Sequence, residues 1–171
     1  MKYNFLIRLF HLLIAIGVIL QLFIGFFFDG LFAKLNGAFF MTIHKSIGLS
    51  LAILIILLLI TRLLSKKIPY PKAMSPLHIF VAKLVHIGLY LCVFCMAMTG
   101  LIASQLFQSQ WQFFYWFNVP ILLPRNPELG REIFSWHPWV AYILLALVVL
   151  HILAALYHKY IAKDGIVKKM L

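Results

Sequence analysis

Residues 137–151 read HPWVAYILLALVVLH, an apolar run with a histidine at each end. An α-helix turns by about 100° and rises by about 1.5 Å per residue, so the fourteen-residue interval returns His151 to nearly the same face as His137, about 21 Å further along the axis. A polar side chain inside an apolar helix is costly and usually functional. This stretch therefore predicts one helix that carries two binding levels, one near each surface of a membrane.

The whole chain has the composition of an integral membrane protein. Of its 171 residues 64% are hydrophobic and four are acidic, and the mean hydropathy is +1.02. A membrane span needs about 20 mostly apolar residues. The sequence thus predicts an all-α fold, a transmembrane four-helix bundle in one membrane domain over residues 1–171. The four predicted helices cover residues 5–28, 40–61, 79–104 and 138–158.

The fifteen basic residues predict the orientation of the bundle, because cytoplasmic loops retain Lys and Arg. Eleven lie near the chain ends or around the second connection, so both termini are expected in the cytoplasm. The net charge of +11 is then attributed to topology and contact with lipid headgroups, not to nucleic-acid binding. The eleven are Lys2, Arg8, Arg62, Lys66, Lys67, Lys72, Lys83, Lys159, Lys163, Lys168 and Lys169, and the four opposite are Lys34, Lys45, Arg125 and Arg131.

Residues 105–131 form an aromatic segment between the third and fourth predicted helices. Aromatic side chains favour the membrane–water interface, so the segment is expected to lie along the outer surface, in part as helix. An interfacial anchor is the simpler interpretation, and a cover over a cofactor is the more specific one. Its crowded aromatic residues are Trp111, Phe113, Phe114, Tyr115, Trp116 and Phe117.

Seven histidines occur, and their depths predict where cofactors bind. With the amino terminus inside, only His44 and His137 share the outer level. Two neutral imidazoles at one level suit the axial ligands of a b-type haem. Bare zinc or copper sites more often recruit carboxylate or thiolate ligands, and no acidic residue lies inside the predicted helices. Cys92 and Cys95 form a C-x-x-C within an apolar run, where packing is the expected role.

The inner level has more histidines than one haem needs. His151 is favoured because of its spacing from His137, and His11 is the candidate from the first helix. His158, seven residues after His151, would replace it if the inner haem lay at the interface. His86 and His158 are otherwise expected beside the ligands or at a quinone.

Haem propionates require cationic or hydroxyl partners near each surface. Lys45 and Arg131 are the outer candidates, either for a propionate or for steering an anion, with Ser46 as a hydroxyl partner. Arg8 and Lys83 are the inner candidates.

Several motifs, in order, resemble the bacterial cytochrome b561 family across all four predicted helices. They are RLFHLLIA at residues 8–15, HKSIG at 44–48, TRL at 61–63, HIGLY at 86–90, SWH at 135–137, LHILAALYHKY at 150–160 and KDGIVKKM at 163–170. The resemblance implies an inner-membrane protein with two b haems, with His44 and His137 on the outer haem and His11 and His151 on the inner one. It also suggests His158 at a quinone site.

The resemblance is closest to the family's superoxide oxidase activity, which passes electrons from superoxide to ubiquinone. The expected function is therefore that of an oxidoreductase that takes electrons from periplasmic superoxide through two b haems to ubiquinone, within membrane lipid. One alternative is an anchor subunit that relays electrons to quinone from a hydrogenase or dehydrogenase as redox partner protein. Another is a non-redox proton or metal channel lined by the histidines.

Overall fold

Four long helices make up most of the structure, a computed structural model that describes residues 2–66, 68–71 and 74–170. Each is long and apolar enough to cross a membrane, which confirms the predicted all-α bundle of four apolar helices. Lys67 and Lys72, two of the basic residues counted above, lie outside the described residues. The helices are α1 (Phe5–Phe26), α2 (Ala33–Leu64), α3 (Pro76–Leu106) and α4 (Pro127–Tyr157).

Three of these helices begin at a polar side chain that accepts a hydrogen bond from a first-turn N–H. Asn4 caps α1, Ser75 caps α3 and Asn126 caps α4. Proline follows the cap in α3 and α4, where its missing N–H costs nothing because that donor has no partner within the helix. These local signals fix the helix starts independently of the apolar pattern.

The boundaries of α2 and α4 differ from the sequence-based expectation. α4 starts at Pro127, so Pro138 lies inside the helix instead of opening it. α2 starts at Ala33, but Asn36 has an extended backbone (φ −165°) and its side chain accepts from Phe39 N–H at 3.1 Å. Asn36 thus acts as a second cap, close to the expected start at Phe40. A π-helical turn, η1 (Phe28–Phe32), joins α1 to α2.

The aromatic segment forms a short antiparallel hairpin instead of the expected partial helix, and its last residues belong to α4. β1 (Gln112–Phe113) pairs with β2 (Phe117–Asn118). Phe114 and Tyr115 between them have positive φ values of 44° and 64°. This turn is normally made by Asn-Gly or Asp-Gly, so the sequence carried no signal for it.

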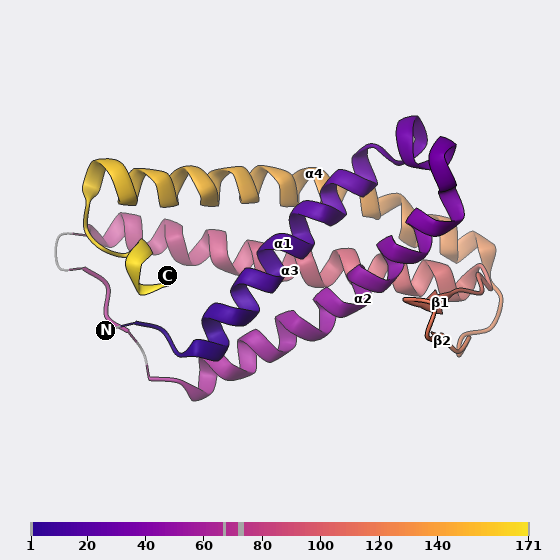
Figure 1. Cartoon of the computed structure of the whole chain (residues 1–171), viewed down its shortest axis with the longest axis horizontal. Coiled ribbons are helices and arrows are strands. Elements are labelled where there is room, and N and C mark those ends of the chain that lie inside the picture. Colours follow the sequence, from indigo (N-terminus) through magenta and orange to yellow (C-terminus); the bar gives the residue numbers. More distant parts are fainter. Residues whose placement is uncertain (1, 67, 72–73, 171) are drawn as a thin grey trace.

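The helices pack in sequence order, α1 on α2, α2 on α3 and α3 on α4. Their shared core is aliphatic, while many large apolar side chains on the outer faces stay exposed, as a lipid-facing surface requires. Figure 1 shows both termini at one end of the bundle and the hairpin at the other. At the terminal end, Tyr3 N–H donates to the Lys169 carbonyl at 2.9 Å. Two short helices, η2 (His158–Ala162) and η3 (Val167–Lys169), follow α4.

Candidate haem sites

His44 on α2 and His137 on α4 face each other at the hairpin end of the bundle. Their ring centroids lie 6.2 Å apart, with an angle of 66° between the ring planes. Two imidazoles that bind one iron from opposite sides, each through a bond of about 2 Å, hold their centroids about 6 Å apart. The spacing therefore fits a single haem iron between the two rings.

A cavity of about 620 Å³ extends from this pair towards the middle of the bundle. This volume lies within the range of about 300–1,000 Å³ found for cofactor and ligand pockets. Three glycines, Gly25, Gly48 and Gly100, line it, and a Cβ at Gly100 would lie 3.3 Å from His137 Cε1. The missing side chains leave space that a flat apolar ring system can fill. The chemistry of the lining thus agrees with haem.

The hairpin segment covers this cavity and is hydrogen-bonded to α2. Trp111 is buried and lines the cavity. Lys45 Nζ donates to Ser104 Oγ at 3.0 Å and to Ser109 Oγ at 2.8 Å, and it lies 5.8 Å from the centre of the Trp111 ring. Ser46, fully buried, accepts from Phe114 N–H at 2.9 Å. The aromatic segment is therefore part of the wall of the site.

The two outer cationic candidates are placed differently. Lys45 lines the cavity beside His44. Arg131 is exposed in the second turn of α4 and is absent from the described residues that line the cavity. A contact with a buried outer propionate is accordingly available to Lys45, not to Arg131.

A second histidine cluster lies towards the other end, where α1, α3 and α4 meet. His11 and His151 have ring centroids 6.1 Å apart, almost the spacing of the outer pair. His86 lies closer to His151, at 5.1 Å with the rings nearly perpendicular, and its Nδ1 donates to the Ala82 carbonyl at 2.5 Å. Of the two pairs, His11 with His151 has the spacing that suits an iron between the rings.

The sequence analysis missed a polar pair beside this cluster. Arg62 of α2 donates a hydrogen bond to the Tyr90 hydroxyl of α3, and the Tyr90 ring lies 6.4 Å from His86. The sequence analysis counted Arg62 only as a cytoplasmic charge. Its position in the last turn of an apolar helix could have indicated a polar partner on a neighbouring helix. Lys83, an expected inner cation, is exposed, and Arg8 is half-buried on α1.

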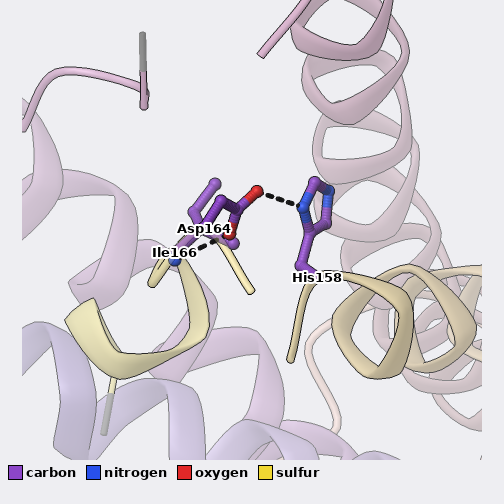
Figure 2. A network of polar contacts seen from close by, with 3 residues as sticks. All are labelled: His158, Asp164 and Ile166. Atoms are coloured by element: carbon purple, nitrogen blue, oxygen red, sulfur yellow. Dashed lines mark hydrogen bonds and ion pairs between the residues drawn. The ribbon is translucent and has the colours of Figure 1, made fainter. Parts of the chain in front are cut away.

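His158 lies apart from the paired rings and contacts a carboxylate (Figure 2). Its Nδ1 lies 2.6 Å from Asp164 Oδ2, and Asp164 Oδ1 accepts from Ile166 N–H at 3.0 Å. The two side chains are 16% and 10% exposed. A carboxylate has no proton to donate when ionised, so Nδ1 of His158 is the donor, and Nε2 has no hydrogen-bond partner among the described residues.

Bare metal binding has little support in the part of the chain that the structure describes. Within it, no group of three or more His, Cys, Asp or Glu side chains is arranged to hold a metal ion. Cys92 and Cys95 are free thiols on α3. The donor sets that do occur are pairs of imidazoles in apolar surroundings, as in bis-histidine haem sites.

Comparison with known proteins agrees with this chemistry. The sequence profile of the prokaryotic cytochrome b561 family matches residues 2–171. The chain is 28% identical to "Cytochrome b561 homolog 2" of Escherichia coli (strain K12) over 176 aligned positions, which cover 99% of this chain and 91% of that protein. Membership implies a multi-pass membrane cytochrome that uses haem b for electron transfer. The chain belongs to the prokaryotic cytochrome b561 family.

Proposed function

We propose that this protein is a di-haem cytochrome of the bacterial inner membrane that takes electrons from periplasmic superoxide and delivers them to ubiquinone. The observation that carries the proposal is the presence of two histidine pairs with matching spacing, 6.2 Å and 6.1 Å, at two levels of one bundle. α4 contributes one histidine to each pair and is continuous between them. When bound, haem b supplies a one-electron carrier at each level.

If each imidazole pair held one haem, neither site would leave a position on the metal for an oxygen species. His44 and His137 would hold the outer haem, and His11 and His151 the inner one. His86 lies against His151 and would pack beside the inner site. This division suits electron transfer through the cofactor edge and not dioxygen binding.

The donor side of the proposal depends on charge at the hairpin end. The described residues there include Lys45, whose ammonium lines the cavity, and exposed Asp29, which also lines it. The sequence puts four basic and three acidic side chains on the hairpin side of the bundle, a net charge of +1. They are Lys34, Lys45, Arg125 and Arg131 against Asp29, Glu128 and Glu132. Steering of the superoxide anion would therefore depend on the local field of Lys45 and not on the overall charge.

The acceptor side is assigned to the terminal end, where Nε2 of His158 has no hydrogen-bond partner among the described residues. The overall reaction is balanced as follows: two superoxide anions are oxidised to two dioxygen molecules, and one ubiquinone takes up two electrons and two protons to give ubiquinol. His158, oriented by Asp164, is the group proposed to hold a quinone oxygen: in its imidazolium form it would donate a hydrogen bond, and then a proton, from Nε2–H to that oxygen. At the end of α4 it would lie near the membrane surface, where protons are available.

The test combines haem quantification with a superoxide and ubiquinone assay on the purified protein. We expect two b haems per chain and ubiquinol formation that depends on superoxide. His44→Ala or His137→Ala should remove one haem and spare the other. His158→Ala should retain both haems and slow quinone reduction, and loss of a haem in that variant would transfer the inner ligand from His151 to His158.

Other results would favour the competing functions. Superoxide decay no faster than spontaneous dismutation, with no ubiquinol formed, would refute superoxide oxidation. Co-purification with an iron–sulphur partner would then favour the relay subunit. A reduced-minus-oxidised spectrum without b-haem bands would instead favour the channel.

A further inference from the structure

Thr99 of α3 contacts the imidazole of His137 across the α3–α4 interface. Its Oγ1 lies 2.9 Å from His137 Nδ1, 2.8 Å from the Cys95 carbonyl oxygen and 3.2 Å from the Met96 carbonyl oxygen. A carbonyl only accepts hydrogen bonds, and a hydroxyl has one proton. Thr99 therefore donates to its own helix and uses a lone pair to accept from His137. Nδ1 of His137 must then carry the proton, which leaves the Nε2 lone pair free.

Two further contacts hold the same ring. Phe134, one turn earlier on α4, stacks on it with centroids 5.4 Å apart and 14° between the planes. Gly100, next to Thr99, lets α3 approach, since a Cβ there would lie 3.3 Å from Cε1 and 3.7 Å from Nδ1 of His137. The Thr99 hydroxyl fixes the position of the proton on the His137 ring. The Phe134 ring and the close approach of α3 at Gly100 fix the plane of the His137 ring.

The opposite imidazole is held differently. Nδ1 of His44 is buried and has no hydrogen-bond partner among the described residues. Gln21 Nε2 donates a hydrogen bond to the main-chain carbonyl of His44 at 2.7 Å. Among the described residues, a side chain therefore accepts a hydrogen bond from Nδ1 of His137 but not from Nδ1 of His44, and that side chain is Thr99.

We infer that Thr99 is a positioning residue for the outer haem, which fixes the tautomer of His137 and sets the reduction potential of the bound iron. The inference rests on the proposed assignment of His44 and His137 as ligands. An acceptor on the non-ligating nitrogen makes the imidazole more basic. A more basic ligand stabilises the ferric state over the ferrous state, so the hydroxyl of Thr99 lowers the potential of the outer haem.

The experiment is a redox titration of the b-haem absorbance in purified haem-loaded protein. Thr99→Val keeps the shape of the side chain and removes the acceptor, whereas Thr99→Ser retains it. Thr61→Val is the matched control, because Thr61 Oγ1 donates to the Leu57 carbonyl at 2.7 Å in the same way but contacts no histidine among the described residues. The spectral component lost in His44→Ala identifies the outer haem.

We expect Thr99→Val to weaken the preference of the outer site for ferric over ferrous haem about tenfold, which raises the potential by about 59 mV for a one-electron couple. The inner haem should not shift, Thr99→Ser should restore the wild-type potential, and Thr61→Val should change neither haem. Selective loss of the outer haem from Thr99→Val, with retention in Thr99→Ser, would also support the inference.

An unchanged outer potential in Thr99→Val with both haems retained would overturn the inference and leave the proposed function intact. An equal effect of Thr99→Ser would overturn it too, because packing and not the hydroxyl would then be responsible. Wild-type protein without b-haem absorbance would instead refute the proposed function, and the inference with it.

Discussion

Three histidines differ in the group that accepts the proton of Nδ1. His86 donates to a main-chain carbonyl, His137 to the Thr99 hydroxyl and His158 to the Asp164 carboxylate. In each of them the acceptor fixes a proton on Nδ1. The acceptors of His86 and His137, Ala82 and Thr99, both lie on α3, whereas Asp164, the acceptor of His158, follows η2 near the chain end.

The sequence predicted which histidines share a level but not these acceptors. Levels follow from the position of each residue in an apolar run, a one-dimensional property. The acceptor for His137 comes from another helix, 38 positions earlier in the chain. Rotation of α3 about its axis determines that contact, and no residue pattern encodes it locally.

Asp164 should give the protein a pH-dependent increment of stability. Burial acts to raise the pKa of its carboxyl, but hydrogen bonds from Ile166 N–H and His158 outweigh burial and lower the pKa below the ordinary 3.8. A carboxyl with a lower pKa in the folded state stabilises the fold above its unfolded pKa, and this contribution disappears as pH falls through the folded pKa. We expect Asp164→Asn to lower the free energy of unfolding at pH 7 by about 1 kcal/mol, the usual net contribution of one hydrogen bond.

The measurement is thermal unfolding of wild type and Asp164→Asn in detergent, at pH 7 and at steps down through pH 3.8. The two proteins should converge in stability at the acid end. Asp29→Asn, an exposed carboxylate at the other end of the bundle, is the control and should follow wild type. A deficit of Asp164→Asn that persisted in acid would show that the charge of Asp164 is not its source.

At the scale of elements, α4 is longer than its apolar run. The sequence placed its start at Pro138 because the apolar pattern begins there, whereas the Asn126–Pro127 cap starts the helix earlier. Hydrogen bonds across the connection support the added turns: Asn126 N–H donates to the Leu106 carbonyl at 3.0 Å. The Gln105 amide donates to the Pro120 carbonyl and accepts from Leu122 N–H. The sequence contains the Asn126–Pro127 cap, but the helix start was predicted from hydropathy alone.

Gly130, in the added part of α4, allows this helix to pack against Phe107 after α3. A Cβ at Gly130 would lie 2.9, 3.1 and 3.2 Å from three atoms of the Phe107 ring. A rigid ring relieves such overlap less easily than a flexible chain, and overpacking typically costs about 1–3 kcal/mol. We expect Gly130→Ala to lower the unfolding temperature measurably in a thermal melt.

Gly37→Ala is the matched control for Gly130→Ala. A Cβ at Gly37 would meet only the Cβ of Ala33, at 3.9 Å, an ordinary van der Waals distance. Its melting curve should therefore stay close to wild type. If both variants melted alike, close packing of the added turns of α4 against Phe107 would not contribute to stability.

For the whole molecule, hydropathy alone predicted four apolar helices, because a bundle in lipid must present apolar side chains on nearly every face. The hairpin over the outer cavity was beyond such reasoning. Its turn uses Phe114 and Tyr115 in left-handed conformations, and its attachment depends on the buried Ser46 hydroxyl from α2. Tertiary hydrogen bonding thus overrides local turn preference.

In the proposed function, the orientation of the bundle would determine which histidine pair faces superoxide. Excess Lys and Arg at the terminal end predicts that this end is cytoplasmic, and Figure 1 shows the hairpin at the opposite end. Trp116 on the hairpin is 79% exposed. In a chain with Cys92 and Cys95 replaced by serine, we expect Trp116→Cys to react with a membrane-impermeant maleimide in intact spheroplasts. Lys168→Cys, within η3, should react only after the membrane is opened.

The reverse labelling pattern would exchange the two sides of the proposed reaction. His11 and His151 would then face the periplasm, and His158 with Asp164 would lie where superoxide arrives. Lys45 and the covered cavity would face the cytoplasm instead. The histidine pairs themselves are nearly symmetric in spacing, so ligand geometry does not fix the direction of electron flow. The distribution of charge and the hairpin cover distinguish the two ends, and labelling tests that distinction directly.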